Sequence, residues 1–158
     1  GINVPSIIKA EENYLYLEDL GEVNFLDWYE EQEKNNALDI SMVYELCSWF
    51  KDFYSAVFEF YKKQFILYDV NFKNFIICDN KVYGIDFEQV RPGHIEEDAG
   101  RLVAFGLTYN PSMTEWKMNF RNIFIDILSN ELNIEKEKII SEENKELAAI
   151  KKRRGAFS

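Results

Sequence analysis

Between Asp39 and Lys63, hydrophobic residues recur at intervals of three and four. This spacing predicts a long helix with a wide buried face, which we expect to lie at the centre of the domain. The side chain of Asp39 or Ser41 can cap its start, and Lys62 and Lys63 suit the negative end of its dipole. The recurring apolar positions are Ile40, Val43, Leu46, Cys47, Phe50, Phe53, Tyr54, Val57, Phe58 and Tyr61.

Short apolar runs separated by polar turns predict two pairs of strands. The first pair lies within residues 4–20, on either side of a polar turn. The second pair, residues 75–78 and 81–85, flanks Asp79 and Asn80, a dipeptide suited to a tight hairpin turn.

Four further helices are expected around the central one. An acidic run in residues 25–34 is typical of a short, exposed helix, and residues 95–109 have the apolar content of a second. An apolar stripe after Pro111 predicts a third helix, and a last one begins near Ser141 and runs into the basic residues 151–154. The predicted fold class is therefore α+β, mainly α.

Composition and charge narrow the possible functions. The 158 residues include 28 Asp and Glu but only 18 Lys and Arg, so a net charge of −10 disfavours nonspecific nucleic-acid binding. No apolar run approaches the roughly 20 residues that span a bilayer, and no secretory signal is evident. We therefore expect a cytoplasmic protein with no membrane partner. One histidine and two dispersed cysteines leave the chemistry mainly to carboxylates and amides.

Three such residues follow the central helix in the order Asp69, Asn74, Asp86. Taken singly, each is more often a loop cap or a turn former. The predicted hairpin, however, returns the chain so that Asp86 faces the loop of residues 69–74. Two carboxylates and one amide oxygen then converge, and such a set suits Mg²⁺, which shares its other positions with phosphate and water.

The order of these segments resembles the protein-kinase-like phosphotransferases. Residues 68–74, in which an Asp is followed five positions later by an Asn, are similar to the catalytic loop of that superfamily. Residues 85–88, Ile-Asp-Phe-Glu, resemble its metal-binding element, and residues 14–21 its adenine-binding strand and hinge. Asp-Phe-Glu, followed by Glu97 and Asp98 with no Ala-Pro-Glu, resembles the aminoglycoside phosphotransferase and choline-kinase branch.

The resemblance implies a role for each matching residue. Asp69 would orient the hydroxyl of the acceptor and take its proton, and Lys73 could reach the transferred phosphoryl group. Asn74 and Asp86 would bind Mg²⁺ against the phosphates of ATP.

Other positions would support the site. Glu18, Asp19 and Leu20 would form the hinge that binds adenine through backbone groups. Asp98 would anchor the catalytic loop by hydrogen bonds, and Leu67 replaces the histidine that usually precedes the catalytic Asp in the family.

The Gly-rich loop, strand lysine and helix glutamate of these kinases are expected before the hinge, and none is recognisable in this sequence. We therefore expect residues 1–21 to be a remnant of the N-terminal lobe and residues 22–158 to be the helical C-terminal lobe. A second copy, or a partner that supplies the missing strands, is expected to cover the apolar residues 14–17.

The leading interpretation is an ATP- and Mg²⁺-dependent phosphotransferase acting on a hydroxyl of a small-molecule or sugar-containing acceptor. The first alternative is a catalytically inactive, pseudokinase-like binding or regulatory module. The second is a Mg²⁺-dependent phosphoesterase that uses Asp69, Asp86 and Asp98 on water.

Overall fold

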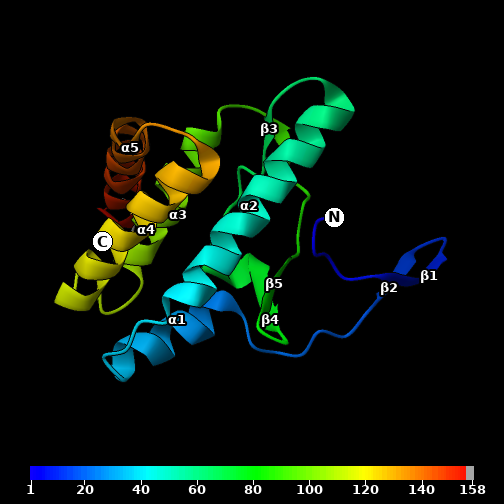
Figure 1. The fold of residues 1–158 in the computed structure, drawn as a ribbon, viewed down its shortest axis with the longest axis horizontal. Coiled ribbons are helices and arrows are strands. Elements are labelled where there is room, and N and C mark those ends of the chain that lie inside the picture. Colours follow the sequence, from blue (N-terminus) through cyan, green and yellow to red (C-terminus); the bar gives the residue numbers. More distant parts are fainter. Residues whose placement is uncertain (156–158) are drawn as a thin grey trace.

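Five α-helices and three two-stranded antiparallel sheets form the part of the chain that the computed structural model describes, residues 1–155. In chain order the elements are β1 (Ile7–Glu11), β2 (Tyr14–Leu17), α1 (Phe25–Lys34), α2 (Ile40–Tyr61), β3 (Phe65–Ile66), the 3-10 helix η1 (Phe72–Asn74), β4 (Phe75–Cys78), β5 (Lys81–Gly84), β6 (Arg91–Pro92), α3 (Ile95–Thr108), α4 (Glu115–Leu132) and α5 (Lys136–Gly155). Helix α2 crosses the middle of the molecule, with α3, α4 and α5 on one side and two hairpins on the other (Figure 1). The predicted α+β, mainly helical class is confirmed.

The long helix α2 forms as its sequence spacing predicts. The carboxylate of Asp39 accepts a hydrogen bond from the backbone N–H of Ser41, and Lys62 ends the helix in a left-handed conformation with φ of 55°. The apolar stripe is buried along most of its length. Trp49 stacks on Phe53 with ring centroids 5.3 Å apart, so this aromatic face belongs to the core.

The helical side of the molecule is built by α3, α4 and α5, and one predicted boundary there is wrong. Helix α5 begins at Lys136, whereas the apolar pattern placed its start near Ser141. Asn133 ends α4 with φ of 52°, and the carbonyl of Glu135 accepts the backbone N–H of Lys138. The first turn of α5 is mostly charged, and this composition concealed it. No helix within residues 1–155 is long and apolar enough to cross a membrane.

Helix α1 is less exposed than its acidic run indicates. A capping box between Asn24 and Asp27 starts the helix, and Phe25 and Tyr29 are fully buried. Glu33, expected on a solvated face, pairs with the ammonium group of Lys117, which is itself buried. A buried ammonium must be paired, so this ion pair joins α1 to α4.

The hairpin of β4 and β5 has the predicted turn. Asp79 and Asn80 both adopt positive φ, 49° and 58°, as a two-residue hairpin turn of this kind requires. Its outer edges are also bonded, because the N–H of Gly84 donates to the carbonyl of Asn3 and that of Ile77 donates to the carbonyl of Val23. The chain around β1 and β2 is thereby tied to this hairpin at both ends.

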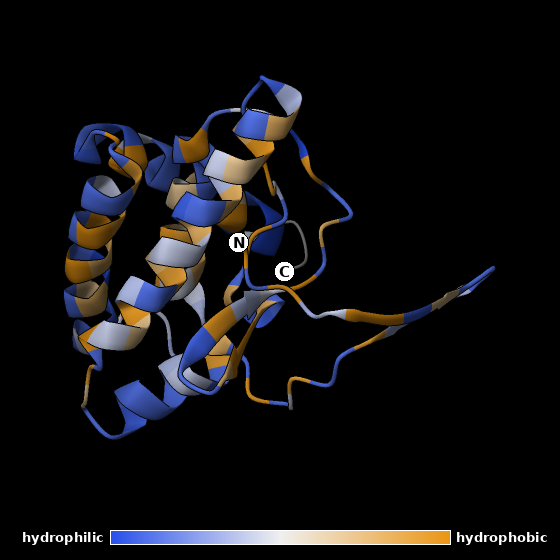
Figure 2. Ribbon diagram, turned by 45° about the vertical axis from the view of Figure 1, so that its right-hand side comes forward, coloured by the Kyte–Doolittle hydropathy of each residue, from blue (hydrophilic) through white to orange (hydrophobic). Residues whose placement is uncertain are grey.

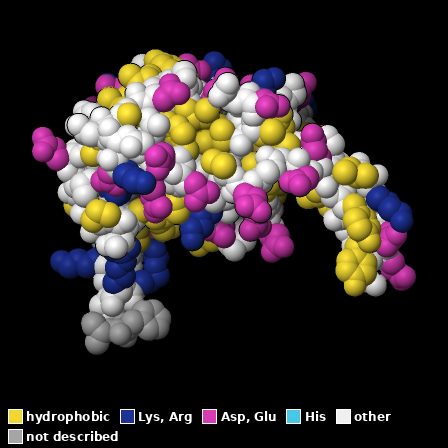
Figure 3. Space-filling view, turned by 90° about the horizontal axis from the view of Figure 1, so that it is seen from below, with side chains coloured by type: hydrophobic (Ala, Val, Ile, Leu, Met, Phe, Trp, Pro, Cys, Tyr) yellow, Lys and Arg dark blue, Asp and Glu magenta, His cyan; other side chains and the backbone are white. Residues whose placement is uncertain are grey.

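The hairpin of β1 and β2 projects away from the rest of the molecule (Figures 1 and 2). Every residue of both strands is exposed. Apolar side chains cover this arm (Figure 3); Ile7 is 65% exposed and Tyr14 is 69% exposed. An isolated two-stranded ribbon is marginally stable in water, so the arm lacks the packing that supports the other elements.

We expect Gly84→Ala to lower the free energy of unfolding by about 1–3 kcal/mol, the usual cost of overpacking. A Cβ atom at Gly84 would lie 2.1 Å from Cζ2 of Trp49, so β5 could no longer pack closely on α2. Urea unfolding followed by circular dichroism measures the change. Gly106→Ala is the matched control, because its Cβ would meet Phe72 at an ordinary 3.4 Å; equal stability losses in both variants would contradict this account.

Candidate functional site

The loop that carries Asp69 is fixed by one buried carboxylate. Asp98, on the first turn of α3, accepts hydrogen bonds from the backbone N–H groups of Leu67, at 2.7 Å, and Tyr68, at 3.0 Å. The hydroxyl of Tyr54 in α2 donates to the same carboxylate at 2.8 Å. The predicted contact between Asp98 and this loop is confirmed, and Asp98 also joins the loop to α2 and α3.

Burial and hydrogen bonding act on Asp98 in opposite directions. Burial raises the pKa of the Asp98 carboxyl above its ordinary value, while the hydrogen bonds from Tyr54, Leu67 and Tyr68 and the charge of Arg101 lower it. The pKa of Tyr54 is also raised, chiefly by burial and then by the neighbouring carboxylate. All three hydrogen-bonding neighbours are donors, an arrangement that matches the acceptor-only ionised carboxylate.

Tyr68 adopts a left-handed backbone conformation with φ of 66°, which is costly for a bulky residue. Two guanidinium groups lie close to its ring centroid, that of Arg91 at 3.3 Å and that of Arg101 at 4.5 Å. Such cation–π contacts stabilise the ring, and the hydrogen bond to Asp98 stabilises its backbone. Together these contacts fix the direction in which the chain enters Asp69.

The segment after Asp69 brings Asn74 close to both ends of the predicted site. The side-chain amide of Asn74 donates to the carbonyl of Asp69 at 3.2 Å. Its own carbonyl accepts the N–H of Ile85, the residue before Asp86, at 2.9 Å. Asn71 stabilises the intervening turn by accepting the N–H of Lys73 at 3.0 Å. The structure therefore places Asp69, Asn74 and Asp86 on adjoining segments, with Asn74 bonded to Asp69 and to Ile85, the neighbour of Asp86.

Asp86 and Lys73 are exposed on these segments. Asp86 has φ of 62°, a left-handed backbone conformation directly after the hairpin. The next residue, Phe87, stacks on Trp49 and Phe53, with centroids 6.1 Å from each. This packing turns Phe87 toward α2 and leaves the carboxylate of Asp86 in solvent.

The three predicted hinge residues have clear local roles. Glu18 closes the base of the β1–β2 hairpin, since its carboxylate accepts the N–H of Ser6 at 3.1 Å. Asp19 accepts the N–H of Gly21 at 2.9 Å and forms a turn, while Leu20 is buried. The backbone N–H of Glu18 is also used within the arm, since it donates to the carbonyl of Ser6 at 2.9 Å.

The donor set fits Mg²⁺ in kind. Asp69, Asn74 and Asp86 offer only oxygen ligands, which this cation prefers. Within residues 1–155, no group of three or more His, Cys, Asp or Glu side chains is arranged to hold a metal ion. An ion at Asn74 and Asp86 would therefore need phosphate and water oxygens to complete its shell.

A small polar pocket of about 250 Å³ opens beside Asp69. Its other lining residues are Tyr68, Gln89, Arg101, Phe105, Glu146 and Arg153. Glu146 connects the two arginines, with its carboxylate 3.7 Å from Nε of Arg101 and 2.6 Å from Nη2 of Arg153. The pocket therefore offers both hydrogen-bond donors and an acceptor next to the candidate base.

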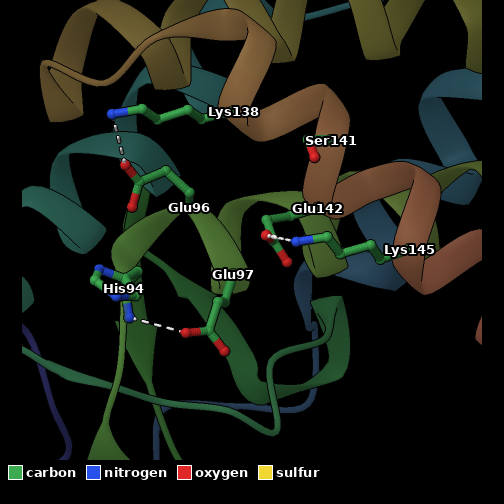
Figure 4. A pocket seen from close by; sticks show the side chains of 7 residues that line it. All are labelled: His94, Glu96, Glu97, Lys138, Ser141, Glu142 and Lys145. Atoms are coloured by element: carbon green, nitrogen blue, oxygen red, sulfur yellow. Dashed lines mark hydrogen bonds and ion pairs between the residues drawn. The ribbon is translucent and has the colours of Figure 1, made fainter.

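A larger cavity of about 570 Å³ lies elsewhere, between α3 and α5 (Figure 4). Its charged side chains already pair with one another. Lys138 faces Glu96 at 3.9 Å, Lys145 bonds Glu142 at 2.5 Å, and Glu97 accepts the backbone N–H of His94 at 3.0 Å. This cavity contains none of the predicted site residues, and of these pairs only Lys138–Glu96 connects its two helices.

Sequence reasoning missed Tyr54 and the two arginines around Tyr68. Arg101 follows Asp98 by three positions on α3, a spacing that brings side chains together and could have indicated the pair. Tyr54 lies on an apolar stripe, and nothing in the sequence shows that its hydroxyl meets Asp98. Arg91 reaches Tyr68 only through the pairing of β6 with β3.

Comparison with known proteins gives no information on the chemistry of this site. No protein-family model matches the chain, and no curated protein matches it significantly.

We expect Asp98→Asn to destabilise the fold, because an amide cannot accept from three donors with its single oxygen. Each buried donor left without an acceptor costs about 1–3 kcal/mol. Urea unfolding at neutral pH tests this against Asp52→Asn, an exposed aspartate on α2. A loss no larger than that of the control would show that the carboxylate does not support the loop.

Proposed function

We propose that this chain is an ATP- and Mg²⁺-dependent phosphotransferase of the aminoglycoside phosphotransferase and choline-kinase type. It would transfer the γ-phosphoryl group to a hydroxyl of a small-molecule or sugar-containing acceptor. The observation that carries the proposal is the set of hydrogen bonds by which Asn74 connects Asp69 to Ile85, the residue before Asp86. Asp98 holds the start of the same loop through the N–H of Leu67. The order of the motifs in the sequence and these contacts both support the proposal.

The chemical step assigns one task to Asp69. Its carboxylate accepts a hydrogen bond from the acceptor hydroxyl and takes the proton as the oxygen bonds to the γ-phosphorus. The bond from that phosphorus to the bridging oxygen breaks, and ADP leaves. Catalysis of this kind depends mainly on positioning, which the contacts of Tyr68 and Asp98 supply.

Asn74 and Asp86 would bind Mg²⁺, which neutralises charge on the nucleotide phosphates. Phe87 stacks on Trp49 while Asp86 is exposed, so the carboxylate of Asp86 is accessible to a metal ion. Leu67, two positions before Asp69, has a structural role. Its side chain is buried, and its N–H donates a hydrogen bond to Asp98. Replacement of a histidine there leaves the proposed chemistry intact.

The pocket beside Asp69 suits a hydroxyl-rich acceptor. Gln89, Arg101 and Arg153 carry N–H groups that could donate to a ligand, the carboxylate of Glu146 could accept, and Phe105 gives one apolar wall. At about 250 Å³ the pocket has room for only a small part of a ligand, such as one sugar ring.

We expect Asp69→Asn to lower turnover by about 10²–10⁴-fold, the usual effect of losing a general base. ADP release from ATP and Mg²⁺ with a panel of aminoglycosides, monosaccharides and choline measures this. Because Asp69 is exposed and bonds through its backbone carbonyl, the variant should fold. Unchanged turnover would exclude Asp69 as the base.

We expect Asp86→Asn to weaken binding of Mg²⁺ and ATP by at least about tenfold, through loss of a charged ligand. Asparagine tolerates the left-handed backbone at this position, so the fold should persist. Calorimetric titration compares the variant with the parent chain and with Asp79→Asn, an exposed aspartate in the turn of the β4–β5 hairpin. Equal affinities in all three would contradict the assignment.

The exposed β1–β2 arm favours a second function, a pseudokinase-like binding module. Strands from a partner or a second copy would pair with the arm and cover its apolar side chains. Light scattering across a concentration series tests for association of copies, while Asp69-dependent transfer to any acceptor would exclude an inactive module.

A further inference from the structure

An apolar groove of about 410 Å³ lies between α5 and the end of α3, apart from the site of Asp69. Leu147, Ala148 and Ile150 of α5 line one side, and Met113 of the loop before α4 lines the other. The backbone of Met113 is held against α3, because its N–H donates to the carbonyl of Leu107 at 2.8 Å. Among residues 1–155, no aromatic side chain lines the groove, and its aliphatic walls suit a flexible aliphatic chain.

Two cations stand on the rim of this groove, Lys151 and Arg154. They share one face of α5 with Leu147 and Ile150, since the four residues follow helical spacing. Arg154 donates to the carbonyl of Thr108 at 3.0 Å, which places its guanidinium across the end of α3.

These two cations differ from most others in the protein. Neither Lys151 nor Arg154 has a carboxylate partner within residues 1–155, whereas Arg153, on the same turn, bonds Glu146 at 2.6 Å. What distinguishes Lys151 and Arg154 is their place beside an apolar groove, where no carboxylate of residues 1–155 neutralises them and an anion could bind. Lys and Arg side chains gather at this end of the molecule (Figure 3).

We propose that this groove binds a free medium-chain fatty acid. The alkyl chain lies against Met113, Leu147 and Ile150, and the carboxylate pairs with Lys151 and Arg154. The volume falls within the usual range of small-molecule sites, and the unbranched side chain of Met113 can adapt to an alkyl chain. This binding is independent of the proposed phosphoryl transfer.

Titration of the full chain with sodium decanoate, followed by calorimetry, tests the proposal. We expect saturable binding that weakens with octanoate, by up to about fourfold for each methylene no longer buried. Decanol, which lacks the charge, should bind about tenfold more weakly.

The Lys151→Gln/Arg154→Gln double variant should bind decanoate about tenfold more weakly than the parent chain does, because the carboxylate loses its charged partners. Lys152→Gln is the matched control, because Lys152 lies on the same turn but does not line the groove. Met113→Glu, at an exposed position, should abolish binding by placing a carboxylate in the groove.

The proposal is overturned if decanoate shows no saturable binding to the parent chain. It is also overturned if the double variant binds decanoate as tightly as the parent, or if decanol and decanoate bind equally well.

Discussion

The carboxylate of Asp98 is the contact on which the arrangement of the site depends. It is buried at the start of α3 and accepts hydrogen bonds from Tyr54 on α2 and from the backbone of Leu67 and Tyr68. One side chain thus joins the two helices of the core to the loop that presents Asp69. Each donor meets an acceptor, so the energetic cost of burying the charge is offset by bonds that also fix a direction.

Most of the elements could be predicted from hydrophobic spacing, because α2, α3 and the β4–β5 hairpin each bury one face against the core. Asp79 and Asn80 identified the turn, since these residue types tolerate the positive φ that it needs. The start of α5 was missed because its first turn carries mostly charged residues. There the helix follows from the chain reversal after Asn133 and from burial of Ile139, which no local pattern shows.

The order of the candidate site residues along the chain could be predicted, but the contacts that hold their loop in place could not. The spacing of Asp69, Asn74 and Asp86 indicated three residues around one loop, and the side-chain and backbone hydrogen bonds of Asn74 place them on adjoining segments. The cations around Tyr68 depend on β6 returning beside β3 and on the orientation of α3. Such contacts arise from tertiary packing, so a single sequence carries little signal for them.

The β1–β2 arm divides the molecule into two levels of stability. Its strands bond to each other, but every side chain on them is exposed, so opening the arm exposes little additional apolar surface. Its amide protons should therefore exchange with solvent long before those of α2 and α3, whose opening requires the core to separate. A protease that cuts between Glu11 and Tyr14 would consequently leave the helical core folded, with the bonds at Asn3 and Val23 still joining both ends of the cut chain to the β4–β5 hairpin.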